Sequence, residues 1–142
     1  MREREQLIKN FTIILPHLLR KVMKKLPDLV IPKQQIDLLH HICICNGKTM
    51  SYYSEVMLIP KSNLTVLADK LIKEGLAVRE LDTKDRRSIN LNITDKGIAF
   101  MRMHNEMLQK EIHQLFAALD DEDIKTLNHT IYEMKMILTK LE

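Results

Sequence analysis

Glycine, proline and aromatic residues are scarce in this chain of 142 residues, which has three glycines, four prolines, no tryptophan and 4% aromatic residues. Glycine and proline occupy most tight turns, and aromatic residues are typical of strands, so their scarcity argues against a large sheet. Leu, Ile, Met, Lys and Glu are abundant instead, and these residues favour helices. The composition therefore predicts a mainly α protein.

Long apolar segments are also absent. No run of eighteen apolar residues occurs, and the first ten residues, MREREQLIKN, lack the apolar stretch of a signal peptide. We therefore expect a cytoplasmic protein without a membrane partner. At 142 residues with 45% apolar content, the chain is long enough to form one domain with a core of its own.

Cysteine is limited to two residues, Cys43 and Cys45. Two positions apart on a helix, their side chains would point in nearly opposite directions, so we expect no disulfide between them. His41 and Cys45 lie four residues apart and could share a helical face as metal ligands, but the nearby sequence supplies no third or fourth ligand. We expect no metal site and no cofactor, while metal or thiol-based redox sensing stays open as an alternative.

Motifs typical of enzymes are missing as well. The sequence has no Gly-rich phosphate loop and no nucleophile motif. Its carboxylates cluster at expected helix starts, where capping explains them. We therefore expect no catalytic residues and no enzymatic activity.

The formal net charge of +3 is too small to indicate a polyanionic partner by itself. Its distribution is uneven, however. Residues 1–33 carry eight Lys or Arg against three acids, whereas residues 100–142 carry five against eight. Basic charge is thus concentrated away from the C-terminal segment.

Both ends of the sequence have the apolar spacing of long helices. In residues 1–27 Pro16 interrupts the pattern and predicts a kink or a helix that starts near it, and Asp120 begins a C-terminal helix with a heptad seam. The seam needs a partner helix, either in the same chain or, as we favour, in a second copy. The candidate dimerisation residues are Leu7, Phe11, Ile14, Leu18, Leu127, Ile131, Met134, Leu138 and Leu141.

The middle of the chain predicts a helix-turn-helix. One helix is expected from about Lys33 to Cys45, where Asn46-Gly47 ends it, and a short one over residues 50–57. A third follows in residues 60–75, and Gly75 ends it. Its apolar positions have the spacing of a core-facing stripe, at Leu64, Leu67, Ala68, Leu71 and Ile72. A short helix, a turn and a longer helix match the helix-turn-helix, although any pair of packed helices fits the same pattern.

A single β-hairpin is expected after Gly75. Its strands are LAVREL, residues 76–81, and SINLNIT, residues 88–94, in which Ile89, Leu91 and Ile93 alternate with polar residues. Such a hairpin must lie against helices to be stable. Thr94 is then expected to cap a long helix that runs to about Leu119.

A helix-turn-helix followed directly by a charged hairpin predicts a winged helix that binds DNA. The second helix would enter the major groove, and the hairpin tip would reach the neighbouring backbone or minor groove. Candidate DNA-binding residues are Lys61, Ser62, Asn63, Thr65, Val66 and Lys70 on the helix and Lys84, Arg86 and Arg87 on the wing, with Asp85 holding a neighbouring guanidinium in place. The alternatives are an ordinary exposed valine at Val66 and a solvated charged turn at the tip.

The stretch KLIKEGLAVRELDTKDRRSINLNITDKG, residues 70–97, resembles the MarR family of winged-helix transcription regulators. The similarity lies in the Gly-Leu junction, the arginine of the first strand, the Asp-x-Arg tip and the exit LNITDKG, residues 91–97, which is similar to the Leu-x-Leu-Thr-x-x-Gly of the family. It implies a homodimer with interleaved terminal helices that binds a near-palindromic operator, commonly as a repressor released by a small-molecule effector, which the sequence does not identify. It also implies that Arg87 enters the minor groove, that Asp85 orients it and that Arg86 contacts phosphate.

The sequence departs from the family pattern at three places. Pro60 stands where Ser or Thr often caps the recognition helix, Tyr53-Ser54 replaces a usual Leu-Ala pair, and Val66 replaces a polar or basic residue. These changes bear on the operator more than on the fold.

We thus expect one winged-helix domain over residues 1–142. Its DNA-binding region spans residues 33–97, and its dimerisation helices lie in residues 1–32 and 98–142. A winged-helix module that binds another protein, without sequence-specific DNA binding, is the alternative function.

Overall fold

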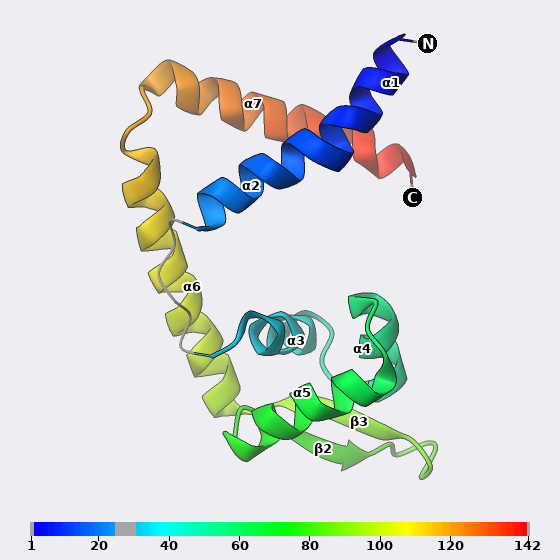
Figure 1. The fold of residues 1–142 in the computed structure, drawn as a ribbon. Helices are drawn as coiled ribbons and strands as arrows, with labels where there is room; N and C mark the ends of the chain where they lie inside the picture. The colour runs from blue at the N-terminus through cyan, green and yellow to red at the C-terminus, as the bar shows by residue number, and fades with distance from the viewer. Residues whose placement is uncertain (1, 25–30, 142) are drawn as a thin grey trace. The chain divides into compact units, whose positions relative to one another are not determined.

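The computed structural model describes residues 2–24 and 31–141 (Figure 1). The chain divides into two compact units, which are described separately below. Unit 1 comprises residues 1–27 and 108–142, and unit 2 comprises residues 28–107. The division falls inside a helix, α6 (Asp95–Phe116), so α6 belongs to both units.

The three predicted helices of unit 2 are confirmed as α3 (Lys33–Ile44), α4 (Met50–Met57) and α5 (Lys61–Lys73). Gly47 follows α3 with a φ of +74°, a left-handed conformation that glycine adopts without strain. Thr49 caps α4, because its hydroxyl accepts a hydrogen bond from the Tyr52 main-chain N–H at 3.2 Å. Together α4 and α5 form the expected helix-turn-helix.

The core of unit 2 lies between α3, α4, α5 and the sheet. The predicted stripe of α5 is buried at Leu64, Leu67, Ala68 and Leu71, and Ile72 packs against the same core while half-buried. Leu38, Leu39 and Ile42 from α3, Tyr53 from α4 and Leu91 from the sheet complete its fully buried centre. Each fully buried aliphatic side chain of this kind stabilises a fold by about 1.5–3 kcal/mol.

The sheet has three antiparallel strands in the order β1-β3-β2, where the sequence predicted a hairpin of two. β2 (Ala77–Leu81) and β3 (Ile89–Ile93) form the expected hairpin, and β1 (Lys48–Thr49) adds a short third strand on the other edge of β3. The Asn46 side chain fixes this edge by accepting a hydrogen bond from the Ile93 N–H at 2.8 Å. Two residues are too few to show a period of two in sequence, so the sequence does not predict β1.

The expected apolar face of β3 is buried unevenly. Leu91 is fully buried and Ile93 is half-buried, but Ile89 is 42% exposed because it lies toward the tip of the hairpin, beyond the helices. The wing is therefore anchored by Leu91 with support from Ile93, and Ile89 does not contribute to the core.

The start of α6 is clamped to the end of α5. The Thr94 hydroxyl accepts a hydrogen bond from the Gly97 N–H at 3.0 Å and donates one to the Gly75 carbonyl at 2.6 Å. A Cβ on Gly97 would lie 2.2 Å from the Leu76 carbonyl oxygen, so only glycine fits here. The predicted cap at Thr94 is confirmed.

In unit 1, helical backbone runs from α1 (Arg2–Lys9) through the π-helical segment η1 (Asn10–Ile14) to α2 (Leu15–Met23). Pro16 lacks an N–H and cannot continue the α-helical hydrogen-bond pattern, and the π turn lies immediately before it. Because α2 begins at Leu15 with Pro16 in its first turn, the expected helix start near Pro16 is confirmed. The two prolines Pro27 and Pro32 predict a linker between helices, and this segment lies mostly outside the described residues.

The C-terminal helix of unit 1 is α7 (Asp121–Leu138), followed by the 3₁₀ turn η2 (Thr139–Leu141). The Asp120 carboxylate caps α7 by accepting a hydrogen bond from the Asp123 N–H at 2.8 Å, which confirms the predicted start. Within residues 2–24 and 31–141, no helix has both the length and the apolar character needed to cross a membrane.

Candidate nucleic-acid interface

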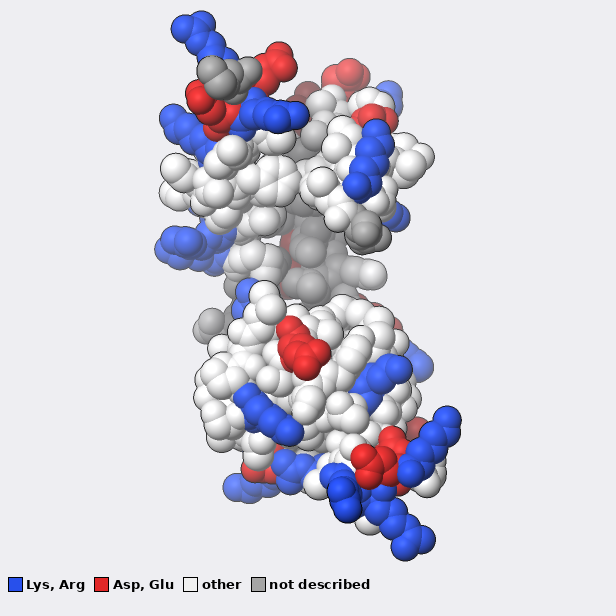
Figure 2. Space-filling model, turned by 90° about the vertical axis from the view of Figure 1, so that its right-hand side faces the viewer, with Lys and Arg blue, Asp and Glu red and all other residues white. Residues whose placement is uncertain are grey.

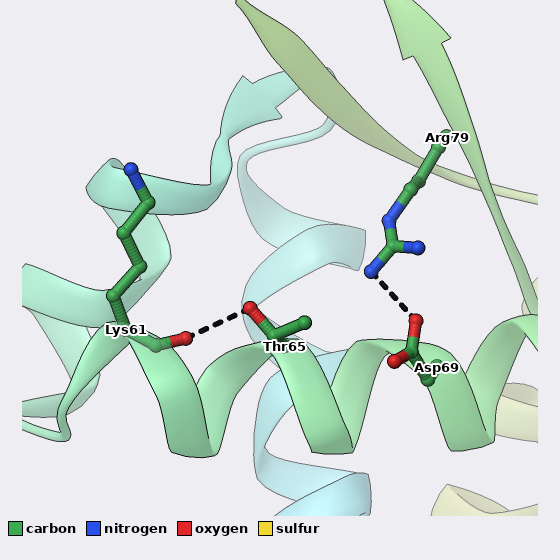
Figure 3. A network of polar contacts seen from close by, with 4 residues as sticks. All are labelled: Lys61, Thr65, Asp69 and Arg79. Carbon is green, nitrogen blue, oxygen red and sulfur yellow. Dashed lines mark hydrogen bonds and ion pairs between the residues drawn. The ribbon is translucent and has the colours of Figure 1, made fainter.

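The polar face of α5 is exposed over its whole length. Opposite the buried stripe, the structure exposes all the recognition-helix residues predicted from the sequence, Lys61, Ser62, Asn63, Thr65, Val66 and Lys70. Val66 is 53% exposed, so its methyl groups are accessible to a ligand. The Thr65 hydroxyl donates to the Lys61 carbonyl at 2.9 Å, which leaves its oxygen free only as an acceptor (Figure 3).

The first turn of α5 has no side-chain cap. Pro60 occupies the N-cap position, and neither its own side chain nor Ser62 nor Asn63 caps the helix in the structure. The first N–H groups of α5 therefore face outward without a side-chain acceptor. A helix start with exposed N–H groups and a positive dipole end favours a phosphate oxygen.

The Tyr53-Ser54 pair holds the turn that positions α5, a role that the sequence did not reveal. The Ser54 hydroxyl donates to the Ile59 carbonyl at 2.7 Å, and the Ile59 N–H donates back to the Ser54 carbonyl at 3.2 Å. Leu58 between them adopts the left-handed conformation with a φ of +54° and is 90% exposed. These bonds set the angle between α4 and α5.

The Tyr53 side chain ties α4 to the segment that enters β1. Its hydroxyl donates to the Cys45 carbonyl and accepts from the Lys48 N–H at 3.2 Å. Burial raises the pKa of Tyr53, and the nearby Cys45 side chain raises the pKa of the neighbouring Tyr52. Both hydroxyls thus stay protonated at neutral pH.

The wing turn is organised by Asp82, which the sequence reasoning did not single out. One carboxylate oxygen accepts from the Lys84 N–H at 2.7 Å and the Asp85 N–H at 3.1 Å, and the other accepts from the Asn90 side-chain amide at 3.0 Å. The Asn90 hydrogen bond, followed by the two main-chain ones, lowers the pKa of Asp82. An aspartate at the first position of a turn was the available signal, because it commonly accepts from the N–H two residues on.

Asp85 supports the wing through the main chain. Its carboxylate accepts from the Arg87 N–H at 3.0 Å and from the Ser88 hydroxyl at 3.4 Å. In the described part of the chain it forms no ion pair with a guanidinium, so the structure does not show the contact expected from the sequence. Lys84, Arg86 and Arg87 are all exposed around this turn.

An ion pair joins α5 to the sheet. Nη2 of Arg79, in the middle of β2, lies 2.7 Å from Oδ1 of Asp69 on α5 (Figure 3). Asp69 lies on the exposed face of the helix, and its pairing with Arg79 was not predicted from the sequence. Because the partners come from different elements, their contact depends on how α5 packs against β2.

These residues give one edge of unit 2 a basic surface. In Figure 1, α5 and the turn between β2 and β3 lie at the same end of unit 2. Figure 2 shows Lys and Arg side chains projecting from this edge, with acidic side chains between them. Such a surface attracts the negatively charged backbone of a nucleic acid when its acidic side chains are engaged in ion pairs or hydrogen bonds, as Asp69, Asp82 and Asp85 are.

The predicted dimerisation residues lie on unit 1 and are exposed in this chain. They come from the first segment, at Leu7, Phe11, Ile14 and Leu18, and from α7 and η2, at Leu127, Ile131, Met134, Leu138 and Leu141. Exposed apolar side chains in this number mark an interaction surface.

The histidines and cysteines do not come together. Among the residues that the structure describes, no three His, Cys, Asp or Glu side chains lie close enough to hold a metal ion. Cys43 is exposed and Cys45 is half-buried, and both are free thiols.

Known proteins similar to this chain include transcription regulators of one family. The MarR family model matches residues 31–88, from the start of α3 to the wing. The chain is 33% identical over 67 residues to the uncharacterised HTH-type transcriptional regulator YkoM of Bacillus subtilis, which covers 47% of this chain and 44% of YkoM. Over its helix-turn-helix and wing, the chain is therefore similar to the MarR family.

Two further MarR-type relatives are named as repressors. The transcriptional repressor MprA of Escherichia coli is 30% identical over 82 residues, 58% of this chain and 47% of MprA. The HTH-type transcriptional repressor MdtR of B. subtilis is 28% identical over 101 residues, 68% of this chain and 65% of MdtR. The matches thus span about half to two thirds of the length of these relatives.

Solved MarR-family structures have the same fold over most of the chain. A MarR-like regulator of Thermotoga maritima has a TM-score of 0.67 at 24% identity and covers 89% of this chain and 92% of its own. E. coli MarR in its apo form has a TM-score of 0.70 at 22% identity and covers 84% and 96%. A Staphylococcus aureus MepR mutant bound to an oligodeoxyribonucleotide has a TM-score of 0.63 at 21% identity and covers 93% and 95%. The mainly α winged-helix fold predicted from the sequence is therefore confirmed.

Proposed function

We propose that this chain is a DNA-binding transcription regulator, a homodimeric repressor of a near-palindromic operator. The observation that carries the proposal is the exposure, at one edge of unit 2, of the polar face of α5 together with the basic wing turn. MprA and MdtR, both named as repressors, support repression as the mode of action.

In this proposal α5 lies in the major groove. Lys61 and Lys70 contact phosphates on either side, and the uncapped helix start donates N–H groups to a phosphate oxygen. Ser62, Asn63 and Thr65 then face base edges, where the Thr65 oxygen acts as an acceptor because its proton is bonded to the Lys61 carbonyl. Val66 packs on a thymine methyl group.

The wing reaches the neighbouring minor groove. Arg87 enters it, since guanidinium groups suit the strong negative potential of a narrow minor groove. Lys84 and Arg86 contact phosphates. Asp82 and Asp85 shape the turn by accepting hydrogen bonds from its main-chain N–H groups, so their negative charge is partly satisfied inside the wing.

A second copy of the chain covers the apolar residues of unit 1. The exposed seam of α7 runs through Ile131 and Leu138, which lie one heptad apart, and heptad spacing pairs helices efficiently. A two-fold symmetric dimer presents two copies of α5, and such a dimer binds an operator with two related half-sites. A small molecule that releases the operator would complete the regulator, and its identity stays open.

The test is selection of bound sequences from a pool of random duplex DNA, followed by fluorescence anisotropy with the selected duplex at several salt concentrations. We expect a near-palindromic sequence, an affinity that falls steeply with salt, and the mass of a dimer in light scattering. A monomer without salt-sensitive binding to any duplex would contradict the proposal and favour a protein-interaction module.

A further inference from the structure

The ion pair between Arg79 and Asp69 lies beside the proposed recognition surface. Along α5, Lys61, Thr65 and Asp69 follow one another at intervals of four residues, so they form one row on the helix surface. Figure 3 shows this row, with Arg79 reaching from β2 to its far end. Asp69 therefore shares a helix face with two residues proposed to meet DNA.

Asp69 is the one acidic residue of α5, which also carries Lys61, Lys70 and Lys73. An unpaired carboxylate in this row would repel the negatively charged phosphate backbone. Arg79 removes this difficulty, because its Nη2 lies 2.7 Å from the Asp69 Oδ1. The contact turns the acid toward the sheet and neutralises it.

The contact contributes little to folding by itself. The side chains of Arg79 and Asp69 are 36% and 56% exposed, and ion pairs at such exposed positions are weakly stabilising. The position of Arg79 is set independently, since β2 pairs it with Leu91, whose side chain is fully buried. The strand pairing thus fixes the main chain of Arg79, from which its side chain reaches Asp69.

We propose that Arg79 is a positioning residue for DNA binding, which acts through Asp69. It holds and neutralises the single carboxylate of α5, so that the helix presents a basic and polar face to the duplex. This inference rests on the proposed function, and it extends the DNA-binding machinery to a residue of β2 that was not among the predicted DNA-binding residues.

The experiment is a double-mutant cycle with Arg79→Gln, Asp69→Asn and the two combined, measured by anisotropy on the selected duplex. We expect Arg79→Gln to weaken binding about tenfold, because it leaves Asp69 unpaired next to phosphates. Asp69→Asn alone should bind as tightly as the unchanged chain or more tightly. In the combined variant, the affinity should return to within about threefold of the unchanged chain, as expected for two residues that act through each other.

Two variants control for charge and for the fold. Arg102→Gln removes the same charge from an exposed position of unit 2 and should change binding less than Arg79→Gln. Arg79→Lys keeps the charge and should retain most of the affinity. Thermal unfolding of each variant checks that it is folded, and a fully folded Arg79→Gln protein with weak binding separates the proposed role from a structural one.

The salt dependence separates an indirect role from direct contact. If Arg79 touched phosphate itself, the combined variant would bind as weakly as Arg79→Gln, and the salt slope of both would fall by about one. That result, or equal binding by Arg79→Gln and the unchanged chain, would overturn the inference while leaving the proposed function intact. Failure of the unchanged chain to bind any duplex would instead overturn both.

Discussion

The carboxylate of Asp82 accepts a hydrogen bond from the side-chain amide of Asn90 at 3.0 Å, across the base of the wing. The same carboxylate also accepts from the Lys84 and Asp85 N–H groups, so one side chain closes the turn that carries the wing's basic residues. The shape of the wing therefore depends in part on the ionised form of Asp82.

Lowering the pH should destabilise the wing turn, because Asp82 becomes protonated. Its folded-state pKa lies below the ordinary value of 3.8, so its contribution to stability is fully present above that value and is lost as the pH falls through the lower, folded-state pKa. We expect Asp82→Ala to lower the thermal midpoint at neutral pH, and the difference from the unchanged chain to shrink below about pH 4. Calorimetry between neutral and acidic pH measures this difference.

Thr83→Ala is the matched control, since Thr83 is exposed in the same turn. It should leave the thermal midpoint nearly unchanged at every pH. If the difference in thermal midpoint between Asp82→Ala and the unchanged chain grew as the pH fell, the pH dependence would be opposite to the expected one. That result would contradict the role assigned to Asp82.

Arg87→Ala should lower the affinity for the selected duplex several-fold or more while leaving the dimer intact. The reason is the loss of the group proposed to enter the minor groove, and the salt slope should fall by about one if the guanidinium also displaces a counterion. Anisotropy and light scattering measure the two properties on the same sample. Arg102→Ala serves as the control for charge alone, and equal affinities of the two variants would count against the wing contact.

Ser54→Ala should destabilise unit 2 by about 1 kcal/mol, because it removes the hydroxyl that donates to the Ile59 carbonyl in the turn before α5. DNA binding should weaken as well, since the same turn sets the direction of α5. Ser51→Ala, at an exposed position of the same helix, should be nearly neutral. Urea unfolding of both variants compares them, and equal midpoints would refute the role of this hydrogen bond.

Gly97→Ala tests the close approach of α6 to the end of α5. Helix propensity alone predicts that alanine stabilises a helix by roughly 0.5–1 kcal/mol over glycine. The structure predicts the opposite sign, a loss of about 2 kcal/mol or more, because the new Cβ would lie 2.2 Å from the Leu76 carbonyl oxygen. A rise in the thermal midpoint would show that the backbone has room to move.

The sequence was sufficient to predict a helix or strand and its buried face wherever an apolar pattern repeats within that element. The stripe of Leu64, Leu67 and Leu71 predicted α5 and its exposed face, and the alternation around Leu91 predicted β3. Caps at Thr94 and Asp120 were also predictable, because their hydrogen bonds join residues three apart.

Contacts between distant segments were not predictable in this way. The pairing of Lys48 with Leu91, which makes β1, joins residues far apart in the sequence and involves only two residues of the short strand. The contact of Arg79 with Asp69 requires the packing of β2 on α5. Pro16 marked the irregular turn of the first helix, but a proline signals only the lost hydrogen bond and does not specify a π turn.

The hydrogen bonds at the start of α6 join this helix to the end of α5 within unit 2. α6 is a single helix whose backbone hydrogen bonds run from unit 1 into unit 2, and its first turn is bonded to Gly75, directly after α5. A helix transmits bending and rotation along its axis more faithfully than a loop does. A change in the direction of the first turn of α6 would therefore be transmitted to the C-terminal end of α5 through the contacts of Thr94 and Gly97.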